Sequence, residues 1–274
     1  MERRTVFFVS DQTGVTAETM GHSLLTQFDG QAFRQVTLPF ISTIEKAEEA
    51  VRRINATAQS EGVRPVIFST LVQEELREVI KRAQGLFLDF FDAFLGPLEL
   101  ELKVKSSRAQ GKAHGMQDIG AYTTRINATN FALANDDGAV THDYDRADLI
   151  LVGVSRSGKT PTCLYMALQY GIFAANYPLA DEEFESGRLP PMLLRHERKL
   201  YGLTIAPERL QQIRNERKPN SRYASSAQVE FELRAAEGLF KRHGIPFINT
   251  TESSIEEIAS RILDKTGVER RLRP

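Results

Sequence analysis

The sequence lacks the features that mark secreted and membrane proteins. Its 274 residues include one cysteine, Cys163, and no tryptophan. A single cysteine cannot form an internal disulfide, which is typical of proteins in a reducing compartment. No apolar run reaches the roughly 18 residues of a membrane span, and the run near the N-terminus is too short for a signal peptide. We therefore expect a cytoplasmic protein with no membrane partner.

An excess of charge of either sign is also missing. The chain has 35 Lys and Arg against 36 Asp and Glu, a net charge of −1. A broad basic face for nucleic acid is therefore not expected, and we predict no nucleic-acid partner. The apolar fraction of 41% and the charged fraction of 26% are ordinary for a soluble globular protein. The length fits one large or two modest domains.

The first third of the chain alternates short β-rich runs with helical patterns, which predicts a doubly wound parallel α/β unit. Residues 87–102 are predicted to be helical, with a break near Gly96 and Pro97. Residues 103–118 form a long basic connection, so we place a soft boundary there, between domains 1–104 and 105–274. The predicted strands are 5–9, 36–41 and 65–69, and the predicted helices are 15–28, 43–61 and 73–83.

The second half alternates in the same way and is predicted to be a P-loop-containing α/β domain of kinase-like type. A helix is expected at 119–134, before the acidic residues 136–148. The expected strands are 148–154, 172–175, 200–205 and 246–249, and the later helices are 158–170, 207–217, 224–243 and one ending near 265.

A phosphate-binding motif stands between the strand at 148–154 and the helix after it. The segment fits G-x-x-x-x-G-K-[ST] at every fixed position. The two glycines allow backbone N–H groups to surround phosphate oxygens, and the helix N-terminus adds positive charge. A chance match in a chain of this length is expected on the order of one time in a hundred. The residues are Gly153, Val154, Ser155, Arg156, Ser157, Gly158, Lys159 and Thr160.

Two residues of this motif have expected chemical roles. Lys159 would reach the terminal phosphates, and the Thr160 hydroxyl would be a ligand of Mg²⁺. The motif predicts a nucleotide or phosphate site, but it does not reveal which group is transferred.

Acidic residues gather just before the motif, at Asp136, Asp137, Asp143, Asp145 and Asp148. Phosphoryl transfer needs a carboxylate to orient the acceptor hydroxyl and often one for a metal. Taken one at a time, each of these residues is better interpreted as part of a solvated loop, but as a set beside the P-loop strand we expect at least one to face the phosphate site. The adjacent pair Asp136 and Asp137 is the best candidate, because two neighbouring carboxylates can serve both roles.

Residues 195–222 carry an excess of five positive charges. We expect Arg209 and Arg214 on the solvent-exposed face of one helix. Beyond it, Pro219 interrupts the helix, and the loop holds substrate phosphates, docks an acidic partner or is a plain solvated turn. The candidate contacts are Arg217, Lys218, Ser221 and Arg222.

Two further features are weaker. Residues 10–18 look like a strand–turn–helix anion site, with Thr16 as a candidate N-cap, although many such turns bind nothing. Cys163 follows the P-loop and is interpreted as a core residue rather than a nucleophile.

The chain resembles the bacterial regulatory proteins of phosphoenolpyruvate synthetase, which are related to the pyruvate,phosphate dikinase regulatory proteins. The motifs that carry the resemblance span nearly the whole sequence. They are SDQTG at 10–14 with TAE at 16–18, TLPF at 37–40, DDG at 136–138, GVSRSGKTPT at 153–162, AANYP at 174–178 and NSRYA at 220–224.

The resemblance implies a bifunctional enzyme. One activity transfers the β-phosphate of ADP to a threonine of phosphoenolpyruvate synthetase (pyruvate, water dikinase) and inactivates it. The other uses inorganic phosphate to remove that phosphate and releases diphosphate. The resemblance also implies that Asp137 is the catalytic carboxylate, with Asp136 beside it, and that Lys159 steadies the transferring group.

Two other classes of function remain open from the sequence. One is a P-loop kinase or nucleotide hydrolase that acts on a small metabolite, and the other is a non-enzymatic nucleotide sensor. The sequence also leaves the oligomeric state open, with a homodimer among the options.

Overall fold

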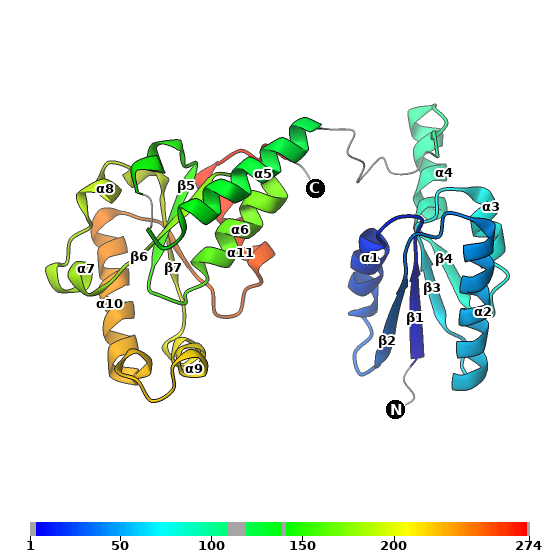
Figure 1. Ribbon diagram of the computed structural model, residues 1–274, viewed down its shortest axis with the longest axis horizontal. Helices are drawn as coiled ribbons and strands as arrows, with labels where there is room; N and C mark the ends of the chain where they lie inside the picture. The colour runs from blue at the N-terminus through cyan, green and yellow to red at the C-terminus, as the bar shows by residue number, and fades with distance from the viewer. Residues whose placement is uncertain (1–3, 109–118, 139–140, 273–274) are drawn as a thin grey trace. The chain divides into compact units, whose positions relative to one another are not determined.

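The computed structural model describes residues 4–108, 119–138 and 141–272 of the chain. The chain divides into two compact units, Met1–Gly115 and Met116–Pro274, and each is described here by itself. Both are mixed α/β units built around a four-stranded parallel sheet (Figure 1). The predicted α/β class is confirmed.

The first unit has the sheet order β2-β1-β3-β4, with every pair parallel. Helices cover both faces: α1 lies on one side, and α2 and α3 lie on the other (Figure 1). The elements are β1 (Arg4–Val9), α1 (Val15–Leu25), β2 (Phe33–Leu38), α2 (Ile44–Glu61), β3 (Val66–Ser69), α3 (Glu74–Ile80), β4 (Leu86–Asp89) and α4 (Phe90–Leu102).

The second unit repeats that strand order as β6-β5-β7-β8, again parallel throughout. Its strands are β5 (Leu149–Gly153), β6 (Ala174–Pro178), β7 (Leu200–Thr204) and β8 (Phe247–Asn249). Its α-helices are α5 (Ile119–Ala134), α6 (Lys159–Tyr170), α7 (Asp181–Ser186), α8 (Pro191–Leu194), α9 (Pro207–Arg217), α10 (Ser226–His243) and α11 (Ile255–Thr266). Its short 3₁₀ turns are η1 (Asp136–Gly138), η2 (His142–Arg146), η3 (Glu197–Lys199) and η4 (Arg222–Ala224).

The core of the second unit has two layers, one on each face of the sheet. Buried residues of α6 and α11 lie in one layer, those of α7, α8, α9 and α10 lie in the other, and α5 contributes buried residues to both. Strand β5 is buried along its whole length between them. The loop after β5 therefore starts from a rigid, central position.

Several elements differ from the sequence predictions. Residues 86–89 form an edge strand paired with β3 instead of the start of a helix. Helix α4 also runs through Pro97 without the predicted break. A proline costs one hydrogen bond to the carbonyl four residues before it. That carbonyl belongs to Ala93, which is exposed and can bond water instead.

The predicted N-cap Thr16 is also wrong. Gly14 caps α1 in the left-handed conformation (φ 87°). A Cβ there would lie 2.7 Å from Cγ2 of Thr37, and the Thr37 hydroxyl donates to Glu18 on α1. The N-terminal sequence motifs thus meet one another as packing partners.

Within the described ranges, no helix combines the length and the apolar character needed to cross a bilayer.

Candidate functional site

The loop of residues 153–160, called here the 153–160 loop, joins the carboxyl end of β5 to α6. β5 pairs with β6 on one side and β7 on the other. The helix that follows β5 packs on one face of the sheet, whereas α9 and α10, which follow β7, pack on the opposite face. In parallel α/β sheets, ligands bind beyond the carboxyl ends of strands at such a point of divergence.

The two glycines of the loop are needed for different structural reasons. Gly153 has φ 156°, and a Cβ on it would lie 2.4 Å from the carbonyl oxygen of Leu203 on β7. Gly158 has φ 95° and begins α6 without a side-chain cap. The N-terminal N–H groups of α6 therefore have no capping side chain, which is the arrangement that favours an anion.

Carbonyl oxygens of the loop are held from inside the protein. The hydroxyl of Ser157 and the ammonium of Lys159 both donate to the carbonyl of Val154, at 2.9 Å each. The hydroxyl of Thr250 donates to the carbonyl of Ser157 at 3.2 Å. The loop backbone is thus fixed before any ligand binds.

Lys159 is almost completely buried, with 4% of its surface exposed. Burial lowers the pKa of its ammonium to about 8, because the low-dielectric surroundings disfavour the charged form. The nearby carboxylates of Asp137 and Asp136 act in the opposite direction. An anion that approached this lysine would add to their effect.

Asp136 links the acidic pair to the loop. Its Oδ1 accepts a hydrogen bond from the Thr160 hydroxyl at 2.7 Å and another from the side-chain amide of Asn176. The amide oxygen of the same Asn176 accepts from the backbone N–H of Asp137 at 3.1 Å. One buried residue of β6 thus holds both aspartates against the start of α6.

Asp137 itself has the left-handed backbone conformation (φ 50°), which Asp tolerates better than most residues. Its side chain is exposed, whereas that of Asp136 is half-buried. The pair therefore divides into a carboxylate bonded to Thr160 and a carboxylate open to solvent.

The structure does not bring the whole predicted acidic run together. Asp148 precedes β5 and so lies at the opposite end of that strand from the loop. There it pairs with Arg271 and accepts from the backbone N–H of Phe173. Asp145 is near His196, with 3.7 Å between the carboxylate and the imidazole.

The basic segment is only partly at the site. Arg222 lines a groove of about 320 Å³ together with Ser155 of the loop. Arg217 and Lys218 are exposed at the C-terminal end of α9, and the hydroxyl of Ser221 closes that end by donating to the carbonyl of Lys218 at 2.8 Å. The full lining is Ser155, Leu179, Ala180, Asp181, Phe184, Arg222, Tyr223, Gln228 and Glu232.

The expectation for Arg214 is wrong, although Arg209 is exposed as expected. Arg214 has no exposed surface and forms an ion pair with Glu232 at 2.6 Å. Arg214 can face the core because Glu232 on α10 neutralises its charge. The sequence periodicity of α9 does not reveal a partner in another helix. Asn176 was also missed as a site residue. A buried Asn in an apolar strand was the available signal, because such a group needs partners.

Cys163 has the role that its surroundings in the sequence indicated. It is buried, and burial raises the pKa of its thiol, which keeps it protonated. Its Sγ contacts the carbonyl of Ala175 at 3.4 Å. It is a core residue of α6.

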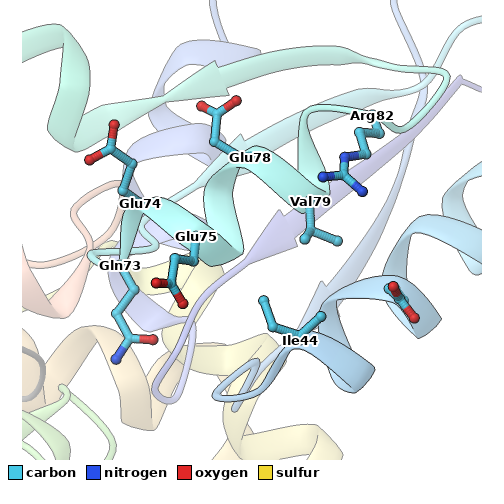
Figure 2. A pocket seen from close by; sticks show the side chains of 8 residues that line it. Ile44, Gln73, Glu74, Glu75, Glu78, Val79 and Arg82 are labelled. Atoms are coloured by element: carbon cyan, nitrogen blue, oxygen red, sulfur yellow. The ribbon is translucent and has the colours of Figure 1, made fainter.

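A larger groove of about 860 Å³ lies in the first unit, between α2 and α3 (Figure 2). Figure 2 shows Glu74 and Glu78 pointing to one side of α3 and Glu75 pointing to the other side, where Ile44 of α2 lies. With Glu48 also in its lining and Arg82 as the basic member, the groove disfavours an anionic ligand. The 153–160 loop is therefore the better candidate for the predicted phosphate site.

The parallel sheets and this strand–loop–helix unit are consistent with an α/β nucleotide-binding fold. A family model described as kinase/pyrophosphorylase matches residues 6–263. The chain belongs to that family.

Similar proteins that share one name cover the chain almost completely. It is 56% identical over 271 residues to a protein of Pseudomonas putida (strain W619), covering 99% of this chain and 100% of the relative. It is 57% identical to one of Pseudomonas aeruginosa (strain LESB58), covering 99% of both. It is 55% identical to one of Alkalilimnicola ehrlichii, covering 98% of both. Each is named "Putative phosphoenolpyruvate synthase regulatory protein".

Proposed function

We propose that the protein is a bifunctional regulator of phosphoenolpyruvate synthase. In one reaction it transfers the β-phosphate of ADP to a threonine hydroxyl of the synthase, leaving AMP and an inactive partner. In the other, inorganic phosphate attacks the phosphothreonine, which releases diphosphate and restores the hydroxyl. The kinase/pyrophosphorylase family and the names of the relatives support this choice.

The observation that carries the proposal is the meeting of Lys159, Thr160 and the aspartate pair at one end of β5. The 153–160 loop would bind the phosphates of ADP in one direction and inorganic phosphate in the other. Lys159 would turn from the carbonyl of Val154 toward the transferring group and offset its negative charge.

Magnesium fits the donors present. The Thr160 hydroxyl and the Asp136 carboxylate are adjacent hard oxygen ligands, the type that Mg²⁺ prefers. Bound there, the ion would neutralise charge on the phosphate oxygens. Cytoplasmic location and ADP as the donor are parts of the same proposal.

Asp137 would act on the nucleophile of each reaction. Its exposed carboxylate can accept the proton of the threonine hydroxyl during phosphorylation. In the reverse direction it can orient a protonated phosphate oxygen for attack. One site would then serve both reactions.

Arg222 lies beside Ser155 in the groove, so it is the basic residue best placed to contact substrate phosphates. Arg217 and Lys218 do not line that groove, and they would contact the partner protein instead.

Purified protein incubated with [β-³²P]ADP and phosphoenolpyruvate synthase tests the proposal. We expect label on a synthase threonine, and its loss as labelled diphosphate when phosphate is added.

Lys159→Ala should lose both activities, because both use the same loop. Asp137→Asn should lower both rates by about 10²–10⁴-fold while ADP still binds, since only the proton acceptor is removed.

Three other outcomes would contradict the proposal. Nucleotide turnover without the synthase would indicate a metabolite kinase or a hydrolase. ADP binding without any transfer would indicate a sensor. Loss of one direction alone in Lys159→Ala would contradict a shared site.

A further inference from the structure

Among the residues that the structure describes, Arg214 is the largest completely buried side chain, and it lies on α9 beneath the 153–160 loop. Its guanidinium contacts three separate segments. It donates to the carbonyl of Ser155 at 3.1 Å, to the carbonyl of Tyr223 at 3.0 Å and to the carboxylate of Glu232 at 2.6 Å. These segments are the loop, η4 and α10.

Two further contacts join the same segments. The guanidinium carbon lies 4.2 Å from the centre of the Tyr223 ring, which fits a cation–π contact. The hydroxyls of Tyr223 and Ser155 are 3.0 Å apart and hydrogen bonded. Ser155 is therefore linked to Tyr223 directly through side chains and indirectly through Arg214.

Stability alone does not account for an arginine here. A buried ion pair is often no more stabilising than apolar residues of similar size, because both charges lose their hydration. Among the described residues, the buried Nε of Arg214 also has no hydrogen-bond partner. What an arginine supplies, and an apolar residue does not, is a rigid planar fork that reaches several acceptors at once.

We propose that Arg214 is a positioning residue that fixes Ser155 of the 153–160 loop, and with it Arg222, in the arrangement that binds phosphate. Glu232 fixes the guanidinium from α10, and Gln228 donates to the other oxygen of that carboxylate at 3.0 Å. Arg222 precedes Tyr223, so the bond to the Tyr223 carbonyl also sets where the Arg222 backbone lies. This inference rests on the proposed function, since it takes the loop to be a phosphate site.

The test compares binding of inorganic phosphate to folded variants by titration calorimetry. Arg214→Met alone would leave the Glu232 carboxylate buried without a counter-charge and could unfold the protein. The main variant is therefore Arg214→Met combined with Glu232→Gln. We expect phosphate to bind about tenfold more weakly or worse, because the loop carbonyl loses its donor. Arg214→Lys keeps the charge but not the fork, and its affinity should lie between those of the double variant and the wild type.

A matched control separates positioning from stability. Arg271 forms an ion pair with Asp148 at the opposite end of β5 and also donates to the carbonyl of Gly171. Arg271→Met should lower the melting temperature and leave phosphate affinity unchanged. The positioning role is overturned if the double variant, measured well below its melting temperature, binds phosphate as the wild type does.

Lys159→Ala tells this failure apart from failure of the proposed function. If Lys159→Ala also binds phosphate normally, the loop is not the phosphate site. If Lys159→Ala loses binding while the Arg214 variants keep it, only the positioning role of Arg214 is wrong.

Discussion

At the scale of single residues, the burial of Lys159 makes phosphate binding depend on pH. The pKa of its ammonium is about 8 in the free protein, and its charged or titratable neighbours are Asp137, Asp136, Arg214 and Cys163. A bound anion favours the charged lysine and raises that pKa. Above pH 8 the free lysine is increasingly neutral, so binding must take up a proton. Phosphate affinity should then fall with a slope that approaches about tenfold per pH unit above pH 8 and flattens as the pH drops below 8.

Titration calorimetry between pH 7.5 and about 9.5 would measure this slope, in a range where phosphate is already largely dianionic. Lys159→Arg is the control, because a guanidinium stays charged throughout. Its affinity, even if weaker, should not change over that range. A level profile in the wild type would show that the lysine charge does not contribute to binding.

The residues that sequence alone predicted at the site are those whose chemistry is local. Gly153, Lys159 and Thr160 belong to one continuous motif, and the aspartate pair lies a short distance before it. Asn176 and Arg214 were not predicted, because each acts through contacts between distant segments. The Arg214 side chain spans 59 residues of sequence to reach Ser155, and Asn176 spans 40 to reach Asp136. No periodic pattern encodes such contacts.

At the scale of elements, the junction between β5 and α6 depends on Gly153. A Cβ at this position would lie 2.4 Å from the backbone carbonyl oxygen of Leu203, which is a steric clash. Strand β7 cannot shift to relieve it without displacing the sheet. Gly153→Ala should therefore lower the free energy of unfolding by about 3 kcal/mol or more. Chemical denaturation measures this loss.

Gly267→Ala is the matched control for that substitution. Gly267 ends α11 with φ 69° and has open space around its Cβ position. It should lose only about 1 kcal/mol, because backbone strain is its only cost. Equal losses in the two variants would contradict the steric role of Leu203.

Helices and strands were predicted best where the hydrophobic pattern was long and had clear ends. The predicted helices 119–134 and 207–217 coincide with α5 and α9. β4 was missed because its four residues continue directly into the apolar sequence of α4, and periodicity does not separate a short strand from a helix there. α7 and α8 were missed because they span only 6 and 4 residues.

At the scale of the whole molecule, each unit has its own core. The clusters of the first unit end at Phe90, and those of the second begin at Ala128. The same strand order appears in both, but the groove of the first unit is lined mainly by glutamates, and that of the second is lined by Ser155 of the loop and by Arg222. Two separate cores can unfold in two separate steps.

Ile54 and Ile262 offer a matched test of that independence. Both are completely buried, Ile54 in α2 and Ile262 in α11. Either change to Ala should cost about 2–5 kcal/mol in its own unit. Scanning calorimetry should show Ile54→Ala lowering one transition and Ile262→Ala lowering the other. Added phosphate should raise only the transition that Ile262→Ala lowers, because a ligand stabilises the unit that binds it. A single transition that both variants lower equally would mean that the two cores unfold together, and phosphate would then protect the first unit as well.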